Sequence, residues 1–512
     1  MKKYSLFLLI ILIISLLYRV SALRINHPFW FDEFATGVYA KLLLQENINL
    51  IDNPDIYFES NNFLTHSLVA IFFNFFGINE TIARVPSLIF GSLVPVIIFF
   101  LAKKLFDLKT AVIAAILIAF SYFEIAWSVQ ARGYVIQQFF SALLFLIYYH
   151  IISSKNNKKR NLFSFLLVSI LGLLTHKLFI LVLAAIFLHF IIFNKKEISK
   201  IIKKPAFILI AVSLALYLIK YIVPSVLEGL DFFKFRNNTW YYHAFLWREY
   251  GLISFLALIG IIYGLIKKLK ETLLFILIIS MQLIFVNFFY GHYIAKYTLP
   301  IFHYLLMLAG LAIAYISTSL NSLLKKPKFK WLIPLLLTFF IVVNGHKFVI
   351  KPKAFYSVNH DMRDIALIDY HQVYQIIQTK GELDKGETAV IDTWWERSRW
   401  YLGFNQPYVY TFRWLNEGFR KVTEFRINDQ GAKYIPRTGK PPIGLISELA
   451  DLKLAMEKYP KGFIWIDDAS LPADVINYAQ NNFKKELDLK QYPLEDNPYV
   501  IWSGSLYSWG IE

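Results

Sequence analysis

Two adjacent carboxylates, Asp32 and Glu33, stand between aromatic residues in the segment HPFWFDEFATGVYAKLL, residues 27–43. A carboxylate shielded by apolar side chains has a raised pKa and is a stronger base, so the flanking Phe31 and Phe34 favour a general base at Asp32. A structural role is also open, because acidic residues in the first turn of a helix stabilise its N-terminus. Asp32 and Glu33 are therefore the candidate catalytic residues.

Basic side chains recur at the ends of several apolar runs. Lysine and arginine there are often interfacial anchors, with the stem in the membrane and the charge in water. Cations that share one face have a second use, since positive groups stabilise a departing phosphate. The candidates for such a donor-phosphate and lipid site are Arg84, Arg132, His176, Lys177, Lys296 and Tyr297. His176 lacks a histidine partner at metal-binding spacing, so no cofactor is required, and the sequence leaves a divalent metal open.

The segment EGLDFFKFRNNTWYYHAFLWREY, residues 228–250, is rich in aromatic side chains. Aromatic faces combined with polar groups are suited to holding sugars. The aromatic belts at membrane–water interfaces have the same composition, so both interpretations stay open. The candidates for sugar or acceptor binding are Glu59, Trp240, Tyr241, Tyr242 and His243.

The composition indicates a membrane protein with many spans. The chain of 512 residues is 57% hydrophobic and 18% aromatic, and it has no cysteine. Disulfides and thiolate metal sites are therefore excluded. The net charge of +17 belongs to the first 350 residues, where membrane topology explains it better than nucleic-acid binding.

Eleven spans are predicted from runs of sufficient length, at about 1–24, 81–106, 109–127, 133–153, 161–175, 177–194, 205–224, 250–267, 271–290, 297–320 and 330–350. The first run resembles a signal peptide, but Arg19 interrupts its end and we interpret it as an uncleaved span. The shorter run 63–77 is expected to be a juxtamembrane helix. Most spans lack central charges, and Glu124 lies near a predicted end.

Basic loops orient these spans by the positive-inside rule. The loops KNNKKR (155–160) and KKPKFK (325–330) are assigned to the cytoplasm together with the N-terminus. Residues 24–80 then form the first external loop, and residues 351–512 lie outside the cell. The acidic residues of that loop are Asp32, Glu33, Glu46, Asp52, Asp55 and Glu59, and the cationic candidates lie on the same face, which favours a phosphate site over simple anchors.

Two domains follow: a transmembrane domain over 1–350 and an extracytoplasmic α/β domain over 351–512. In the latter, apolar strands at 387–395, 462–470 and 497–505 alternate with helices at 364–380, 446–459 and 472–483. Asp392, Asp467 and Asp468 follow strands, where α/β folds often bind ligands. The commoner role of such residues is to cap the next helix or turn.

With these features in place, the chain resembles the C-type (GT-C fold) membrane glycosyltransferase superfamily, and within it the polyprenyl-phosphate-sugar-dependent enzymes that include protein O-mannosyltransferases and lipid A aminoarabinose transferases. The segments that carry the resemblance are WFDEFATGVYAKLL, NETIARVPSLIFGSLVPVIIFFLAKKLF, SVQARGYVIQQFFSALLF, LGLLTHKLFILVLAAIFLHF and GHYIAKYTLPIFHYLLMLAGL. The resemblance implies a catalytic base at Asp32, with Glu33 beside it. The chain departs from the family at Asn61-Asn62, where relatives carry Pro-Pro, at Ser60, and at Lys296, where arginine is commoner.

The sequence thus predicts a membrane glycosyltransferase of the cell envelope. It would transfer a sugar from a polyprenyl-phosphate donor to an extracytoplasmic lipid, polysaccharide or protein, with Asp32 as general base. The expected location is the cell membrane, with the C-terminal domain and active site outside the cytoplasm. The alternative is a transporter or flippase of an envelope precursor, which would be expected to carry ionisable residues inside its spans.

Overall fold

The computed structural model describes residues 4–26, 28–45, 62–153, 158–194, 237–289, 294–323, 331–345, 368–403, 408–415, 425–436, 442–467, 471–490 and 503–511. The chain divides into two compact units. The first comprises residues 1–25, 61–65 and 84–353, and the second comprises 26–60, 66–83 and 354–512. Each unit is described by itself.

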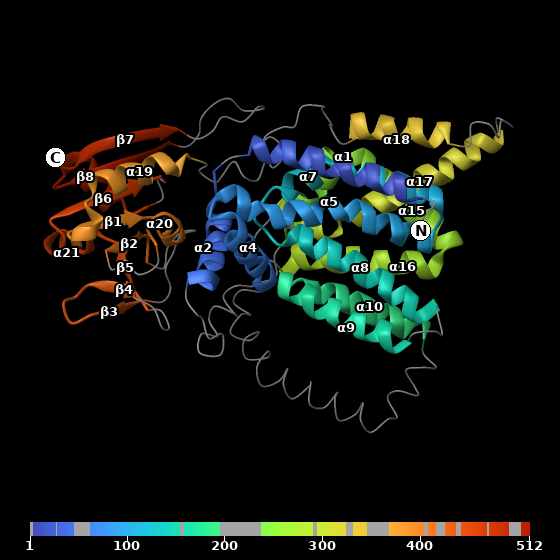
Figure 1. Ribbon diagram of the computed structural model, residues 1–512, viewed down its shortest axis with the longest axis horizontal. Coiled ribbons are helices and arrows are strands. Elements are labelled where there is room, and N and C mark those ends of the chain that lie inside the picture. Colours follow the sequence, from blue (N-terminus) through green and yellow to red (C-terminus); the bar gives the residue numbers. More distant parts are fainter. Residues whose placement is uncertain are drawn as a thin grey trace, which may run out of the picture. The chain divides into compact units, whose positions relative to one another are not determined.

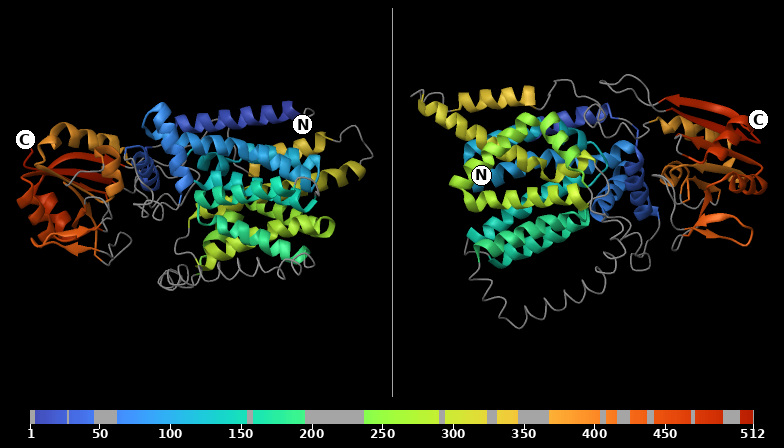
Figure 2. Two further views of the ribbon diagram at one scale, coloured as in Figure 1. Left: turned by 60° about the horizontal axis from the view of Figure 1, so that its bottom comes forward. Right: turned by 180° about the vertical axis from the view of Figure 1, so that it is seen from behind.

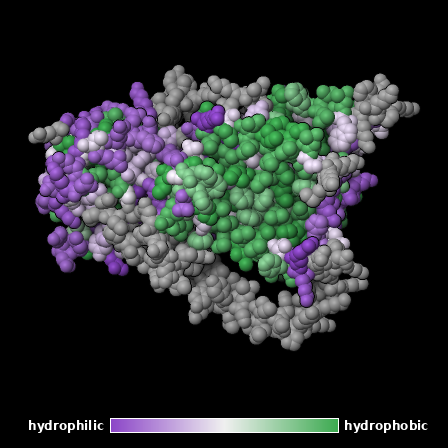
Figure 3. All heavy atoms as spheres, in the orientation of Figure 1, coloured by the Kyte–Doolittle hydropathy of each residue, from purple (hydrophilic) through white to green (hydrophobic). Residues whose placement is uncertain are grey.

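The first unit is a bundle of helices (Figure 1). Its α-helices are α1 (Ser5–Arg24), α5 (Glu80–Leu105), α6 (Leu108–Ala119), α7 (Tyr122–Ser128), α8 (Tyr134–Ser153), α9 (Lys158–Thr175), α10 (Phe179–Phe193), α14 (Thr239–Ala244), α15 (Gly251–Lys267), α16 (Leu269–Ile284), α17 (Leu299–Leu323) and α18 (Leu332–Gly345). Short turns of other helix types are η4 (Phe245–Glu249), η5 (Phe285–Phe289) and η6 (Ala295–Thr298). On the face drawn in Figure 3 the surface of this bundle is mostly hydrophobic.

Five helical segments of the described chain are long and apolar enough to cross a membrane: Ser5–Arg24, Glu80–Leu105, Tyr134–Ser153, Leu269–Phe289 and Ala295–Ser322. Two bent pairs raise the number to seven. The predicted total of eleven is therefore not confirmed, and the predicted span 205–224 lies outside the described residues.

The predicted span 109–127 corresponds to a bent pair of helices. It is broken into α6 and α7, which meet at an angle of 57°. The Ser121 hydroxyl accepts a hydrogen bond from the Glu124 backbone N–H at the start of α7, which gives the second helix its own N-cap.

Two charged side chains are fully buried within the bundle, where the sequence places them near span ends. Arg19 Nε donates to Ser128 Oγ over 3.0 Å, and its Nη1 donates to the Ser15 carbonyl over 3.2 Å. Glu124 accepts a hydrogen bond of 2.9 Å from Gln138 Nε2. Buried ionisable groups need such partners, and Ser128 and Gln138 come from other helices, so spacing along one helix does not reveal them.

The second unit contains α2 (Phe31–Gln45), most of α4 (Phe63–Phe76) and a mixed sheet. The strands are β1 (Thr388–Asp392), β2 (Val409–Phe412), β3 (Arg426–Ile427), β4 (Lys433–Ile435), β5 (Ile443–Ile446), β6 (Lys461–Ile466), β7 (Lys484–Lys490) and β8 (Ser503–Trp509). Their order is β3-β4-β5-β2-β1-β6-β8-β7. The four central strands are parallel, and the pairs toward both edges are antiparallel.

Helices cover both faces of this sheet (Figure 2). They are α19 (Tyr370–Lys380), α20 (Trp395–Leu402), α21 (Leu449–Lys458) and α22 (Ala473–Asn482). The rings of Tyr374 and Tyr401 stack at 4.5 Å, which joins α19 to α20. The β1–α20–β2 and β5–α21–β6 crossovers run in opposite directions along the sheet, so right-handed connections put α20 and α21 on opposite faces.

The predicted α/β character of the C-terminal part is confirmed. Strands at β1, β6 and β8 and helices at α19, α21 and α22 occur where the sequence predicts them, with shifted ends. Helix α20 and strands β2, β3, β4, β5 and β7 are absent from the prediction. Strand β7 is the edge strand KKELDLK, whose charged composition is typical of a protected sheet edge and hides its strand character.

Candidate active site

The candidate acid pair lies in the first turn of α2, in the second unit. The backbone N–H groups of Glu33 and Phe34 both donate to the Trp30 carbonyl, over 2.9 and 3.0 Å. Trp30 and Phe34 are buried, and so are both acids, with Asp32 9% exposed and Glu33 completely buried. Asp32 is therefore shielded from solvent, as a general base with a raised pKa would be, and the acids also lie in the first turn of a helix, where they would stabilise its N-terminus.

The cationic candidates lie in the first unit, where Arg132 and His176 pack on one aromatic ring, that of Tyr134. The guanidinium carbon of Arg132 lies 5.8 Å from the centre of this ring, and the His176 ring centre lies 5.2 Å from it. The Tyr297 ring packs edge-on against it at 6.2 Å. The Lys296 ammonium lies 5.4 Å from the Tyr297 ring. We call Arg132, Tyr134, His176, Lys296 and Tyr297 the Tyr134 cluster.

Three separate turns supply the Tyr134 cluster: the turn before α8, the turn between α9 and α10, and η6 before α17. Gly133 allows them to approach closely. A Cβ at this position would lie 2.6 Å from Thr65 Oγ1 and 2.8 Å from the Thr175 carbonyl oxygen. These distances are too short for any side chain larger than hydrogen, so glycine is needed here.

Arg84 is positioned close to the cluster by its own helix. It is 3% exposed in the second turn of α5, and Ser87 on the same helix donates from Oγ to the Arg132 carbonyl over 2.8 Å. In the next turn of the cluster, His176 Nδ1 accepts the Leu178 backbone N–H at 3.1 Å, which orients the imidazole. Lys177 is exposed, unlike the buried His176 and Lys296.

The described part of the aromatic segment begins at residue 237 and forms α14 and η4, which are bent by 97° from α15 at Tyr250. Tyr242 is buried, and its hydroxyl donates to the Ile294 carbonyl over 3.4 Å, just before η6. Trp240 is 60% exposed, and His243 is also exposed. Tyr241 packs between Trp240 and Tyr242, with ring centres 5.8 and 5.0 Å away. Exposed aromatics on a bent helix suit an interfacial belt as well as a sugar site, so both interpretations stay open.

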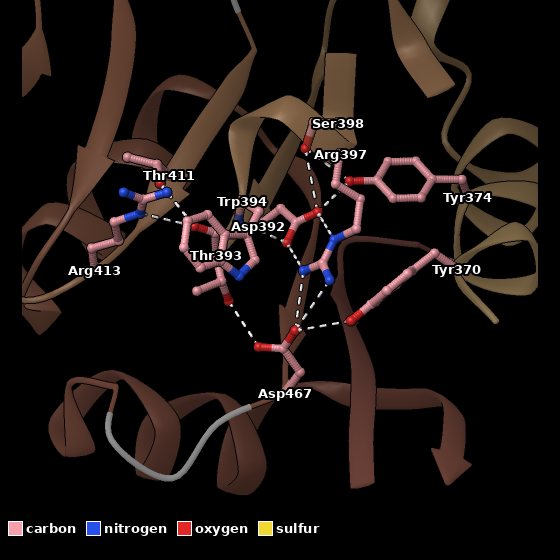
Figure 4. Close-up of polar contacts among 10 residues, drawn as sticks. All are labelled: Tyr370, Tyr374, Asp392, Thr393, Trp394, Arg397, Ser398, Thr411, Arg413 and Asp467. Atoms are coloured by element: carbon pink, nitrogen blue, oxygen red, sulfur yellow. Dashed lines mark hydrogen bonds and ion pairs between the residues drawn. The ribbon is translucent and has the colours of Figure 1, made fainter. Parts of the chain in front are cut away.

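Other sequence candidates lie elsewhere. Glu59 and Asp468 are outside the described residues. Asp392 and Asp467 follow β1 and β6 as predicted, and both carboxylates face Arg397 (Figure 4). Within the described ranges no group of three or more histidine, aspartate or glutamate side chains is arranged to hold a metal ion.

Asp392 and Asp467 are used structurally. Arg397 Nε donates to Asp392 over 2.8 Å, and Nη1 donates to Asp467 over 3.1 Å. Burial alone would lower the pKa of Arg397, but the charges of Asp392, Tyr370 and Asp467 raise it well above its usual value. The Asp392 carboxylate also accepts the Trp394 backbone N–H at the entry to α20, so the predicted capping role is present in part. Through Arg397, these carboxylates join the ends of β1 and β6 to α20.

Tyr134 is the residue of this site that the sequence candidates omit. It directly follows Arg132-Gly133 in the segment SVQARGYVIQQFFSALLF, and a single tyrosine at a span end resembles an ordinary interfacial anchor. Two of its ring contacts, with His176 and Tyr297, come from residues more than 40 positions away, and no local spacing encodes them.

Comparison with known proteins gives matches to both sequence and structure. Residues 62–223 match the family described as dolichyl-phosphate-mannose-protein mannosyltransferase. ArnT from Cupriavidus metallidurans bound to undecaprenyl phosphate superimposes with a TM-score of 0.53 at 7% identity, over 99% of this chain and 98% of that one. The protein has the fold of the C-type glycosyltransferases.

Two further solved structures match the chain. The apo structure of the same ArnT gives a TM-score of 0.50 at 10% identity, over 99% of this chain and 98% of that one. The apo oligosaccharyltransferase of Archaeoglobus fulgidus gives 0.47 at 14% identity, and the match covers 78% of this chain and 64% of that chain. The chain thus spans less than two thirds of that relative. No curated protein matches the sequence significantly.

Proposed function

We propose that the protein is a membrane glycosyltransferase that moves a sugar from a polyprenyl-phosphate-linked donor to an extracytoplasmic lipid, polysaccharide or protein. The observation that carries this proposal is the Tyr134 cluster, in which Arg132, His176 and Tyr297 from three turns pack on one aromatic ring and Lys296 lies against Tyr297. A fold shared with a structure that holds undecaprenyl phosphate adds to it. The membrane would be the cell membrane, with the N-terminus cytoplasmic and the C-terminal domain outside.

The reaction assigns a task to each group. The acceptor hydroxyl or amine attacks the anomeric carbon, and a base takes its proton as the new bond forms. The bond from the anomeric carbon to the phosphate oxygen breaks, and the phosphate leaves with the electron pair. Asp32 is the proposed base, and Glu33 supports the same turn of α2. Arg84, Arg132, His176 and Lys296 would stabilise the departing phosphate.

The test is transfer of labelled sugar from a polyprenyl-phosphate donor into an acceptor, using membranes that contain the full chain. Asp32→Asn should lower the rate by about 10²-fold or more, as loss of a general base does. Glu33→Gln is the matched neighbour and should retain more activity than Asp32→Asn. Full activity of Asp32→Asn would sink the mechanism. Mass spectrometry of envelope glycans with and without the protein would identify the acceptor.

A transporter is the second candidate, favoured by the buried Arg19 and Glu124 in the bundle. Ionisable groups inside a helical membrane protein often mark a transport path. The two functions separate in sealed proteoliposomes loaded with a labelled polyprenyl-phosphate sugar. A glycosyltransferase moves the label onto the acceptor, whereas a flippase moves the intact donor to the other leaflet.

A further inference from the structure

The acid-bearing helix α2 packs on helix α20 of the α/β domain, within the second unit. The Trp400 ring lies against the Phe29 ring, with centres 5.1 Å apart, and against Phe73 at 6.0 Å. Trp400 is 6% exposed, although α20 is only eight residues long. The indole is therefore buried against Phe29, which precedes α2, and Phe73 of α4.

Lys41 adds a polar contact to the same indole. Its ammonium lies 3.9 Å from the centre of the Trp400 ring and donates to the Trp400 carbonyl oxygen. An ammonium over the face of a tryptophan is attracted by the negative π face of the ring. Lys41 lies nine residues after Asp32, so these contacts hold the helix well beyond its first turn.

Tyr401, the next residue of α20, reaches the start of α2. The Phe34 ring packs edge-on against Tyr401 at 5.8 Å and against Tyr370 at 6.0 Å. The Tyr401 hydroxyl donates to Glu80 Oε1 over 3.3 Å. Glu80 Oε2 in turn accepts the Phe29 backbone N–H at 2.9 Å. Contacts thus exist on both sides of the Asp32-Glu33 turn.

Helix α20 is itself anchored in the sheet. Its Arg397 pairs with the carboxylates that end β1 and β6, and Tyr374 stacks on Tyr401 from α19. The close-up in Figure 4 shows Arg397 between Asp392 and Asp467. The surface offered to α2 is therefore built on the core of the domain.

We propose that the α/β domain positions the carboxylates of α2 through a clamp formed by Lys41, Glu80, Trp400 and Tyr401. The inference rests on the proposed function in one respect: that function makes Asp32 and Glu33 the groups whose position matters. Displacing a catalytic group by about 1 Å can cost about 10² in rate. Trp400 is accordingly a positioning residue, which acts through α2.

The experiment compares Trp400→Leu with Trp509→Leu in the full chain. Trp509 is a matched control, because it is 8% exposed, packs on Phe483 and lies in β8. Backbone hydrogen exchange is measured over residues 31–45. We expect Trp400→Leu to speed exchange of α2 at least about 10-fold, since the helix loses its docking surface. Trp509→Leu should leave α2 protected. Unchanged protection of α2 in Trp400→Leu would overturn the clamp.

Sugar transfer supplies the second readout. Trp400→Leu should lower kcat at least about 10-fold with the donor KM changed less than about 2-fold, and Trp400→Phe should recover most of the rate. Faster exchange of α2 with unaltered kcat would overturn the positioning role. If the wild-type protein transfers no sugar, the proposed function fails, while the exchange comparison still decides whether the α/β domain holds α2.

Discussion

Arg397 Nη1 lies 3.1 Å from Asp467 Oδ2, although the two residues are 70 positions apart. Asp467 follows β6, and Arg397 also binds Asp392 at the end of β1, so one guanidinium joins two neighbouring parallel strands to α20. All three side chains are at most 2% exposed. A buried charge that loses its partner keeps its desolvation cost, so this triad should be the most sensitive polar site of the α/β domain.

Arg397→Met should lower the free energy of unfolding of the α/β domain by about 3–5 kcal/mol, because it leaves two buried carboxylates without their cation. Unfolding of the purified full chain, followed by a probe in the α/β domain, measures the loss. The control is Lys485→Met, which removes an exposed ion pair with Asp488 and should leave the midpoint unchanged. Equal midpoints for Arg397→Met and the wild type would contradict the role of the triad.

The sequence singles out two of the three members of this triad. Asp392 and Asp467 are recognisable because each follows an apolar strand. Arg397 is hidden in WERSRWYL, a short polar helix without an apolar stripe, and its partners are set by sheet order. Strand order comes from tertiary packing, so the pairing of β1 with β6 cannot be derived from local pattern.

In the helical bundle, too, the sequence predicts some features and leaves others undetermined. Hydropathy predicts the long helices α1, α5, α8, α16 and α17, since composition alone decides whether a run can span. The break between α6 and α7 depends on the cap at Ser121, and the burial of Arg19 depends on Ser128. Likewise, Arg132 and His176 are candidates by type and predicted side, while their shared contact with the Tyr134 ring is visible only in three dimensions.

Tyr134 should matter for its ring more than for its hydroxyl, because its described contacts with Arg132, His176, Tyr297 and Trp127 are all ring contacts. Tyr134→Ala should raise the donor KM at least about 10-fold. Loss of the buried aromatic ring leaves a cavity, and Arg132 and His176 lose the surface that orients them. Tyr134→Phe should keep the donor KM within about 2-fold. Steady-state kinetics at varied donor concentration measures the KM of both variants. An unchanged donor KM in Tyr134→Ala would show that the Tyr134 cluster does not bind the donor.

Lys41 predicts a pH dependence of stability. Burial lowers the pKa of its ammonium from 10.5 to about 8. Between these values the unfolded chain binds more protons than the folded one, so stability rises with pH across this window. Discounted for partial exposure, the gain is on the order of 1–2 kcal/mol.

The measurement is the difference in unfolding free energy between the wild type and Lys41→Met, taken at about pH 7 and about pH 10. Met retains the apolar stem and cannot titrate. The unfolding free energy of the wild type should increase relative to that of Lys41→Met as pH rises. A difference that stays constant over this range would show that Lys41 titrates normally in the folded protein.

For Gly37→Ala, two opposing effects on stability are expected. It lies inside α2, where glycine costs about 1 kcal/mol relative to alanine, so intrinsic helix propensity alone would make Gly37→Ala stabilising. A Cβ there would lie 2.8 Å from Trp400 Cζ3 and 2.9 Å from Phe29 Cε2. Both neighbours are buried ring atoms with little room to move, so an overpacking cost of about 1–3 kcal/mol should outweigh the gain in helix propensity. We therefore expect Gly37→Ala to lower the unfolding temperature and to speed hydrogen exchange in α2.

Two comparisons isolate the contact with the indole. Gly251→Ala adds a Cβ at the start of α15 with no neighbouring atom within 4 Å, and it should be neutral or stabilising. Combining Gly37→Ala with Trp400→Phe replaces the indole by a smaller ring, so the two substitutions together should cost less than the sum of their separate effects. Strict additivity, or a gain in stability from Gly37→Ala alone, would mean that α2 does not rest against Trp400.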